Sequence, residues 1–82
     1  MKSRAELLQT FQQLATRVAE RPIELTSEAM AISALGIDSL GMLEIIGEME
    51  RELSIRIPDD QLVGINTVGQ LVDLVERRLG AG

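Results

Sequence analysis

The sequence has no cysteine and no histidine among its 82 residues, and its only aromatic residue is Phe11. Without cysteine and histidine, the chain lacks the usual zinc ligands, thiol nucleophiles, disulfide partners and the side chain best suited to proton transfer near neutral pH. We therefore expect neither a metal site nor a catalytic centre of the chain's own. The core has to be aliphatic, which favours helices over a sheet rich in aromatic residues.

The chain also lacks a long apolar run and an excess of basic residues. No stretch is long enough for a signal peptide or a membrane span, so the expected location is the cytoplasm, with no membrane partner. The formal net charge of −5 repels a phosphate backbone, which excludes nucleic acid as an expected partner. The natural electrostatic counterpart is a basic surface on another protein, met in transient contacts.

A chain of this length has room for one core, so residues 1–82 are predicted to form a single domain. Ser3 and Glu6 have the spacing of a capping box, and the apolar stripe that follows predicts a helix ending near Glu20, before Pro22. The irregular pattern up to Ile37 indicates a long loop that lies on the core, with a helical turn within residues 28–34.

The second half of the chain predicts three further helices. One begins at Asp38 or Ser39, and a short one follows Pro58 to about Val63. The last begins at a second capping box, with Gly80 as its C-terminal cap and residues 80–82 as a frayed tail. The expected fold is an all-α four-helix bundle with three longer helices, one short helix, and a long loop between the first two. Its second helix faces the core with a set of apolar residues: Met42, Ile45, Ile46, Met49 and Leu53.

The other face of the second helix carries apolar residues beside carboxylates. A small apolar patch with an acidic border suits docking of a partner that has an apolar hollow and a basic rim. Ser39 has two interpretations at this helix start. As an N-cap or first-turn residue it has only a structural role at the helix start, whereas a phosphodiester on its hydroxyl would sit where the helix dipole favours an anion. The outward-facing residues are Leu40, Leu43, Glu44, Gly47 and Glu48.

Residues 35–40, Leu-Gly-Ile-Asp-Ser-Leu, resemble the attachment motif of acyl carrier proteins. The similarity to this family continues in order and spacing through residues 44–46, 57–60 and 66–71, so that it covers the chain from 35 to 79. The resemblance implies a carrier and not an enzyme. A phosphopantetheinyl transferase moves 4′-phosphopantetheine from coenzyme A to Ser39, and the thiol of the arm then holds acyl groups as thioesters.

The resemblance also implies how such a carrier works in fatty-acid or polyketide biosynthesis. A monomer is expected, which presents its cargo to acyl-loading and ketosynthase-type enzymes that have basic docking surfaces. The family's contact surface corresponds to Asp38, Leu40, Leu43, Glu44, Gly47 and Glu48. The acyl pocket corresponds to Met42, Ile46, Ile57 and Leu62.

Some positions depart from the pattern of fatty-acid carriers. Gly41 stands where many of them have an acidic residue, Arg51 interrupts an acidic run, and residues 31–34 lack carboxylates. These departures favour a polyketide or other specialised acyl pathway. The alternative from a different class is a small helical adaptor that docks through its second helix and is never modified. A Ser39→Ala variant separates the two, because an adaptor would keep its function.

Overall fold

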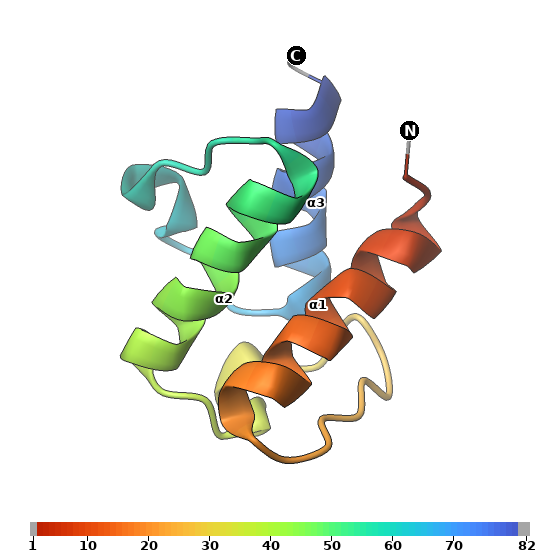
Figure 1. The fold of residues 1–82 in the computed structure, drawn as a ribbon, viewed down its shortest axis with the longest axis vertical. Helices are drawn as coiled ribbons and strands as arrows, with labels where there is room; N and C mark the ends of the chain where they lie inside the picture. The colour runs from red at the N-terminus through yellow and green to blue at the C-terminus, as the bar shows by residue number, and fades with distance from the viewer. Residues whose placement is uncertain (1, 81–82) are drawn as a thin grey trace.

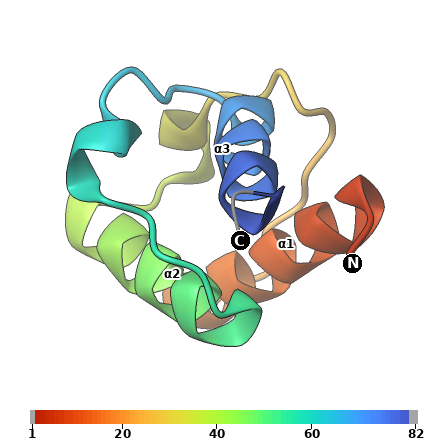
Figure 2. The ribbon, with the colours of Figure 1, turned by 90° about the horizontal axis from the view of Figure 1, so that it is seen from above.

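The structure is a computed structural model that describes residues 2–80. It has three α-helices and two short 3-10 turns (Figure 1). Seen from above in Figure 2, α1 and α2 form one side of the bundle and α3 stands against them. An isolated bridge between Ala31 and Thr67 is the only β-type pairing among the described residues. The elements in chain order are α1 (Arg4–Ala19), η1 (Ile32–Leu35), α2 (Ser39–Leu53), η2 (Asp59–Leu62) and α3 (Val68–Gly80).

Both predicted capping boxes are confirmed. At the start of α1, the Ser3 hydroxyl accepts a hydrogen bond from the Glu6 backbone N–H at 3.2 Å, and the Glu6 carboxylate accepts one from the Ser3 N–H at 2.9 Å. Thr67 and Gln70 make the same reciprocal pair before α3, at 3.1 and 3.0 Å. Each box satisfies two backbone donors that have no partner inside the helix.

The core is aliphatic apart from Phe11, as the composition predicts. The predicted inner face of α2 is buried except at Met42, which is half-buried and packs against the core. Helical spacing therefore identified the inner face correctly. The most deeply buried large side chains come from all three helices: Phe11, Leu7, Leu14, Ile45, Met49, Leu71, Leu74, Val68, Val72 and Val75.

The long loop between α1 and α2 is fastened to the start of α3 by its backbone. The N–H groups of Val68 and Gly69 donate to the carbonyls of Met30 and Glu28, at 3.0 and 2.8 Å. These are N–H groups that a helix start leaves without intrahelical partners. A Cβ atom at position 69 would lie 3.1 Å from both the Cβ and the carbonyl oxygen of Glu28, so glycine permits this close approach.

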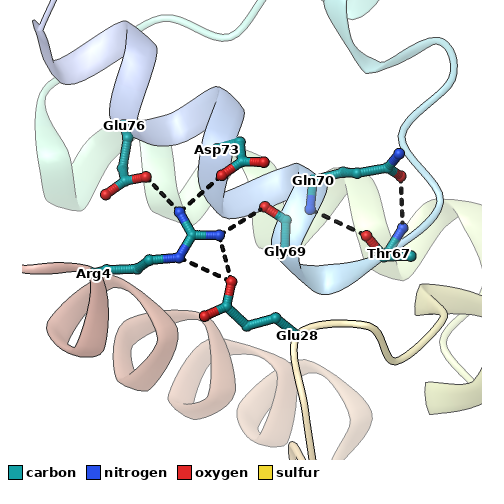
Figure 3. Close-up of polar contacts among 7 residues, drawn as sticks. All are labelled: Arg4, Glu28, Thr67, Gly69, Gln70, Asp73 and Glu76. Carbon is teal, nitrogen blue, oxygen red and sulfur yellow. Dashed lines mark hydrogen bonds and ion pairs between the residues drawn. The ribbon is translucent and has the colours of Figure 1, made fainter.

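Arg4 reinforces the same junction with charged contacts (Figure 3). Its Nε donates to a Glu28 carboxylate oxygen at 2.8 Å, and its Nη1 pairs with Asp73 at 2.8 Å and with Glu76. Its Nη2 also donates to the Gly69 carbonyl at 3.2 Å. The hydrogen bond to Glu28, above all, raises the pKa of Arg4, and the same bond lowers the pKa of the Glu28 carboxyl. This cluster joins α1, the long loop and α3.

The structure refines several predicted boundaries. The short helix after Pro58 is a four-residue 3-10 helix that ends at Leu62, because Val63 has an extended backbone. At its start the Gln61 N–H donates to the Pro58 carbonyl at 3.0 Å. The helical turn expected within residues 28–34 is η1, which covers residues 32–35 and ends one residue beyond the expected range. The prediction that Gly80 caps the last helix and begins a frayed tail is wrong, because Gly80 is itself the last residue of α3. Residues 81 and 82 lie outside the described residues.

None of the helices within residues 2–80 has both the length and the apolar character that a bilayer span requires.

Candidate functional site

A left-handed turn at Gly36 brings the chain to the start of α2. Gly36 has φ 72°, and its N–H donates to the Ser33 carbonyl at 3.3 Å. The guanidinium of Arg21 donates to the Leu35 carbonyl beside it. A Cβ atom at position 36 would lie 2.6 Å from Arg21 Nη2. The positive φ is what favours glycine here, because the Arg21 side chain could move away from a Cβ atom.

The first turn of α2 is capped by Asp38 and not by Ser39. Asp38 has extended backbone angles, and its Oδ1 accepts a hydrogen bond from the Gly41 N–H at 2.7 Å. Ser39 is therefore the first helical residue. It is exposed, and its hydroxyl makes no hydrogen bond to any residue from 2 to 80. Ser39 is thus a first-turn residue and not the N-cap, and its hydroxyl is left available at the positive end of the helix dipole.

The absence of a side chain at Gly41 lets Ile37 and Asp38 pack closely against this helix start. Gly41 is buried, and a Cβ atom there would lie 2.7 Å from Ile37 Cγ2 and 3.2 Å from Asp38 Oδ1. The same atom would lie 3.5 Å from the side chain of Val18 on α1. A side chain at position 41 would thus displace Ile37, so the acidic residue that many fatty-acid carriers have here does not fit this local packing.

The outward face of α2 extends from this serine. Leu40 and Leu43 are 65% and 54% exposed, which is unusual for large apolar residues and marks them as a patch. Asp38 and Glu44 are exposed beside them, while Gly47 and Glu48 are half-buried further along the helix. The structure thus brings together the residues that the sequence assigned to docking: Asp38, Leu40, Leu43, Glu44, Gly47 and Glu48.

The far part of this face is less acidic than the sequence suggests. Glu48 Oε1 accepts from Arg51 at 2.6 Å, and Glu48 Oε2 lies 3.9 Å from Arg17 of α1. The i, i+3 spacing of Glu48 and Arg51 signals the first pair in the sequence, but nothing in the sequence places Arg17 opposite Glu48. Asp38 and Glu44, at the Ser39 end, form no ion pair with any residue from 2 to 80.

Beside the docking face, an apolar hollow of about 180 Å³ opens between α2 and the segment before α3. Met42, Ile46 and Leu62 line it, as the sequence predicts for an acyl pocket. Ile57 does not line this hollow: it is buried, and it lines a separate hollow together with Leu43, Ile46 and Pro58. The sequence missed four further lining residues, which no local motif indicates: Ile32, Leu43, Ile65 and Leu71.

Three features lie together at α2: an available serine at the helix start, an apolar and acidic face around it, and an adjacent apolar hollow. They are the features expected of a helical carrier that holds a prosthetic arm. A sequence profile described as "Phosphopantetheine attachment site" matches residues 6–75, most of the chain. The class is therefore that of phosphopantetheine carriers.

The acyl carrier protein of Amoebophilus asiaticus (strain 5a2) is 48% identical over 63 residues, which cover 77% of this chain and 79% of that protein. The crystal structure of the Thermotoga maritima acyl carrier protein superimposes with a TM-score of 0.86 at 27% identity, covering 95% of this chain and 92% of the other. The solution structure of the oxytetracycline acyl carrier protein gives 0.76 at 28%, covering 92% and 84%.

The chain belongs to the acyl carrier protein family. It carries acyl groups on 4′-phosphopantetheine and serves partner biosynthetic enzymes.

Proposed function

We propose that Ser39 is the residue that carries the 4′-phosphopantetheine arm. The observation that supports this most directly is the cap at Asp38, because it satisfies the Gly41 N–H at 2.7 Å and leaves the neighbouring hydroxyl exposed. The first amides of α2 and its dipole favour a phosphodiester at that hydroxyl. Ser39 also lies within the part of the chain that the phosphopantetheine attachment profile matches.

Attachment of the arm is a phosphoryl transfer in which this chain is the acceptor. A bond forms between Ser39 Oγ and the phosphorus of the arm, the phosphoanhydride bond of coenzyme A breaks, and the adenosine bisphosphate half leaves. The serine proton passes to a base of the transferase. When bound, the arm supplies the thiol that the cysteine-free chain lacks. The chain itself holds the helix start rigid through Asp38 and presents the hydroxyl to the enzyme.

Intact mass spectrometry tests this assignment. The protein is incubated with coenzyme A and a broad-specificity phosphopantetheinyl transferase, and circular dichroism checks that each sample is folded. We expect the mass of one phosphopantetheinyl group to be added to the wild type and nothing to Ser39→Ala. An unchanged mass in folded wild type would overturn the proposal and favour the unmodified helical adaptor.

The face formed by Asp38, Leu40, Leu43, Glu44, Gly47 and Glu48 is the proposed docking surface for the enzymes that act at Ser39. Its exposed leucines supply apolar contact, and its carboxylates near Ser39 suit a basic rim. The partners in this proposal are the transferase and enzymes of acyl-loading and ketosynthase type. A monomeric state and a cytoplasmic location stay predictions from the sequence.

The hollow lined by Met42, Ile46 and Leu62 is the proposed site for the first carbons of a bound acyl chain. An engineered apolar cavity of about 150 Å³ holds one benzene molecule. A hollow of about 180 Å³ therefore has the capacity for a segment of roughly six carbons.

Thermal unfolding of the hexanoyl and unacylated arm-bearing forms tests the hollow. We expect the hexanoyl form to have the higher Tm, because burial of the chain adds apolar contact. Leu62→Trp should fill the hollow and remove the difference. Its matched control is Val63→Trp, at a neighbouring position that is 83% exposed, where the difference should persist. Equal Tm values for both wild-type forms would contradict burial of the chain.

The proposed pathway is polyketide or other specialised acyl biosynthesis, in preference to central fatty-acid synthesis. Two features support it: the buried Gly41, which leaves no room for an acidic side chain, and Arg51, which neutralises Glu48. The malonyl form should be used faster by a polyketide ketosynthase than by a fatty-acid ketosynthase. The reverse order would favour fatty-acid synthesis.

A further inference from the structure

Residues 28–32 of the long loop run antiparallel to residues 66–69, which lead into α3. Three backbone hydrogen bonds join the two segments like the rungs of a ladder, and we call them the loop ladder. The bonds run from the Ile32 N–H to the Asn66 carbonyl at 2.8 Å, from the Val68 N–H to the Met30 carbonyl at 3.0 Å, and from the Gly69 N–H to the Glu28 carbonyl at 2.8 Å. The ladder therefore has one end at Ile32 and the other at Glu28.

The Ile32 end of the loop ladder belongs to the wall of the apolar hollow beside α2. Ile32 lines the hollow from the loop, and Ile65 lines it from the segment before α3. The bond from Ile32 to Asn66, the residue after Ile65, holds these two sides of the wall together. Because protein interiors are close-packed, an acyl chain longer than the hollow holds needs this wall to move. The wall moves outward only when the ladder opens.

Arg4 holds the other end of the loop ladder (Figure 3). Its Nε donates to the Glu28 carboxylate at 2.8 Å and its Nη2 donates to the Gly69 carbonyl at 3.2 Å, so one guanidinium joins both residues of the last rung. The same guanidinium pairs with Asp73 at 2.8 Å and with Glu76. Without its positive charge, the Glu28 carboxylate would face the two carboxylates of α3. Their repulsion would push the loop away from the helix.

Resting on the proposed acyl site, we propose that Arg4 determines the length of the acyl chain that this carrier buries. With Arg4 in place, the ladder holds Ile32 and Ile65 in one wall, and the hollow takes a segment of roughly six carbons. With Arg4 removed, the ladder opens from the Glu28 end and the wall yields to a longer chain. Arg4 acts through the ladder, because it is not among the residues that line the hollow.

Thermal unfolding of the hexanoyl and decanoyl forms tests this inference. The gain in Tm over the unacylated arm-bearing form is measured within each variant, so that the stability change of the variant itself cancels. In the wild type, decanoyl should give no larger gain than hexanoyl, because its additional carbons stay in water. In Arg4→Gln, the decanoyl gain should exceed the hexanoyl gain by at least about 4 °C, the effect of burying roughly one or two further methylene groups.

Arg17→Gln is the matched control. Arg17 is also an arginine of α1 that pairs with a carboxylate, that of Glu48 at 3.9 Å, but this pair lies on the α2 side of the helix and not at the ladder. Arg17→Gln should therefore rank the two chains as the wild type does. The double variant Arg4→Gln and Glu28→Gln removes the repulsion across the last rung. It should bring the decanoyl gain back towards the hexanoyl gain.

Amide hydrogen exchange of the unacylated forms, followed by NMR, tests whether the effect of Arg4 reaches the hollow. The Gly69 and Ile32 amides lie at the two ends of the ladder. In Arg4→Gln both should exchange at least about threefold faster than in the wild type, relative to the Ile45 amide inside α2, which corrects for global stability. Faster exchange at Gly69 alone would mean that the ladder does not transmit the change, and would overturn the inference.

The Tm series separates failure of this inference from failure of the proposed acyl site. If hexanoyl raises the wild-type Tm but wild type and Arg4→Gln rank the two chains alike, the acyl site stands and the role of Arg4 is overturned. If hexanoyl leaves the wild-type Tm unchanged, the proposed acyl site fails and the inference falls with it.

Discussion

The starts of α1 and α3 differ from the start of α2 in what their hydroxyl side chains do. Ser3 and Thr67 each use the hydroxyl to accept a backbone hydrogen bond inside a reciprocal capping box. At α2 the cap is the carboxylate of Asp38, and Ser39 follows it with an unused hydroxyl. A shift of one position relative to the cap thus separates a structural hydroxyl from one that is available for chemistry.

The helix starts also differ in how many polar contacts they make with other segments of the chain. At the start of α3, two backbone N–H groups donate to carbonyls of the long loop, and the Gly69 carbonyl accepts a hydrogen bond from Arg4 (Figure 3). Within residues 2–80, the turn that leads into α2 has one polar contact with the end of α1, the hydrogen bond from Arg21 to the Leu35 carbonyl. The polar network that joins α1, the loop and α3 is therefore separate from the surface that partners must reach.

The largest expected effect contrasts Ser39→Ala with Ser3→Ala. Ser39→Ala should abolish attachment of the arm, yet change the free energy of unfolding by no more than about 0.5 kcal/mol, because the hydroxyl makes no hydrogen bond within residues 2–80. Ser3→Ala should lose about 1 kcal/mol by removing a cap, and it should be modified normally. Urea unfolding and intact mass give both quantities. A large loss of stability in Ser39→Ala would mean that its hydroxyl is structural.

The next effect concerns the junction of α3 with the loop. Gly69→Ala places a Cβ atom 3.1 Å from the Glu28 carbonyl oxygen and should lower the free energy of unfolding by roughly 1–3 kcal/mol, as overpacking does. Gly80→Ala is the control, with open space at its Cβ position. Urea midpoints measure the difference. Equal stability of the two variants would show that the loop yields at this contact without loss.

The cap of α2 gives a smaller effect that separates hydrogen bonding from charge. Asp38→Ala should lose about 1 kcal/mol, a shift of roughly 4–8 °C in Tm, whereas Asp38→Asn should keep nearly all the stability because asparagine caps equally well. Asp38→Asn should still be modified more slowly at low salt, since it removes a carboxylate next to Ser39. If the two variants had the same Tm, Asp38 would not be the cap.

The smallest effect is the pH dependence that Glu28 contributes. Its pKa is lowered in the folded state, chiefly by the bond to Arg4, from an ordinary value of 4.5. The folded state therefore binds this proton less readily than the unfolded chain, so the contribution is complete above about pH 4.5 and is lost as the pH falls through the folded-state pKa. The stability difference between wild type and Glu28→Gln should shrink on acidification.

Glu52→Gln serves as the control for this pH series. Glu52 is exposed on α2, and no ion pair within residues 2–80 involves it. Its substitution removes one carboxylate that makes none of these ion pairs, so it controls for the loss of a single charge. A Glu28→Gln profile parallel to that of the wild type would contradict the role of the Arg4 cluster.

Local signals in the sequence were sufficient for the helices and for the set of residues on the outward face of α2. Capping boxes, helical spacing and Pro22 gave α1 and α3 within a residue or two, and the attachment motif placed Ser39 at the head of α2. The short segment after Pro58 was harder, because an α-turn and a 3-10 turn have the same local sequence preferences, and the extended Val63 decides between them.

Contacts between distant segments could not be predicted. Arg4 meets residues 24 and 72 positions away, and a single exposed arginine near the N-terminus carries no sign of this. The same limit applies to the apolar hollow. Ile57 and Leu62 are close in sequence, yet the path of the chain through η2 places them in different hollows. Which side of a turn each apolar side chain faces is set by tertiary packing.

Peptide mapping by tandem mass spectrometry, after incubation with coenzyme A and the transferase, tests the central claim most directly. It locates the phosphopantetheinyl group on one residue. We predict that the group is found on Ser39, next to the capping Asp38, and on none of the other serines. A group located on Ser3, Ser27, Ser33 or Ser54 would contradict the claim that the cap at Asp38 selects the free hydroxyl.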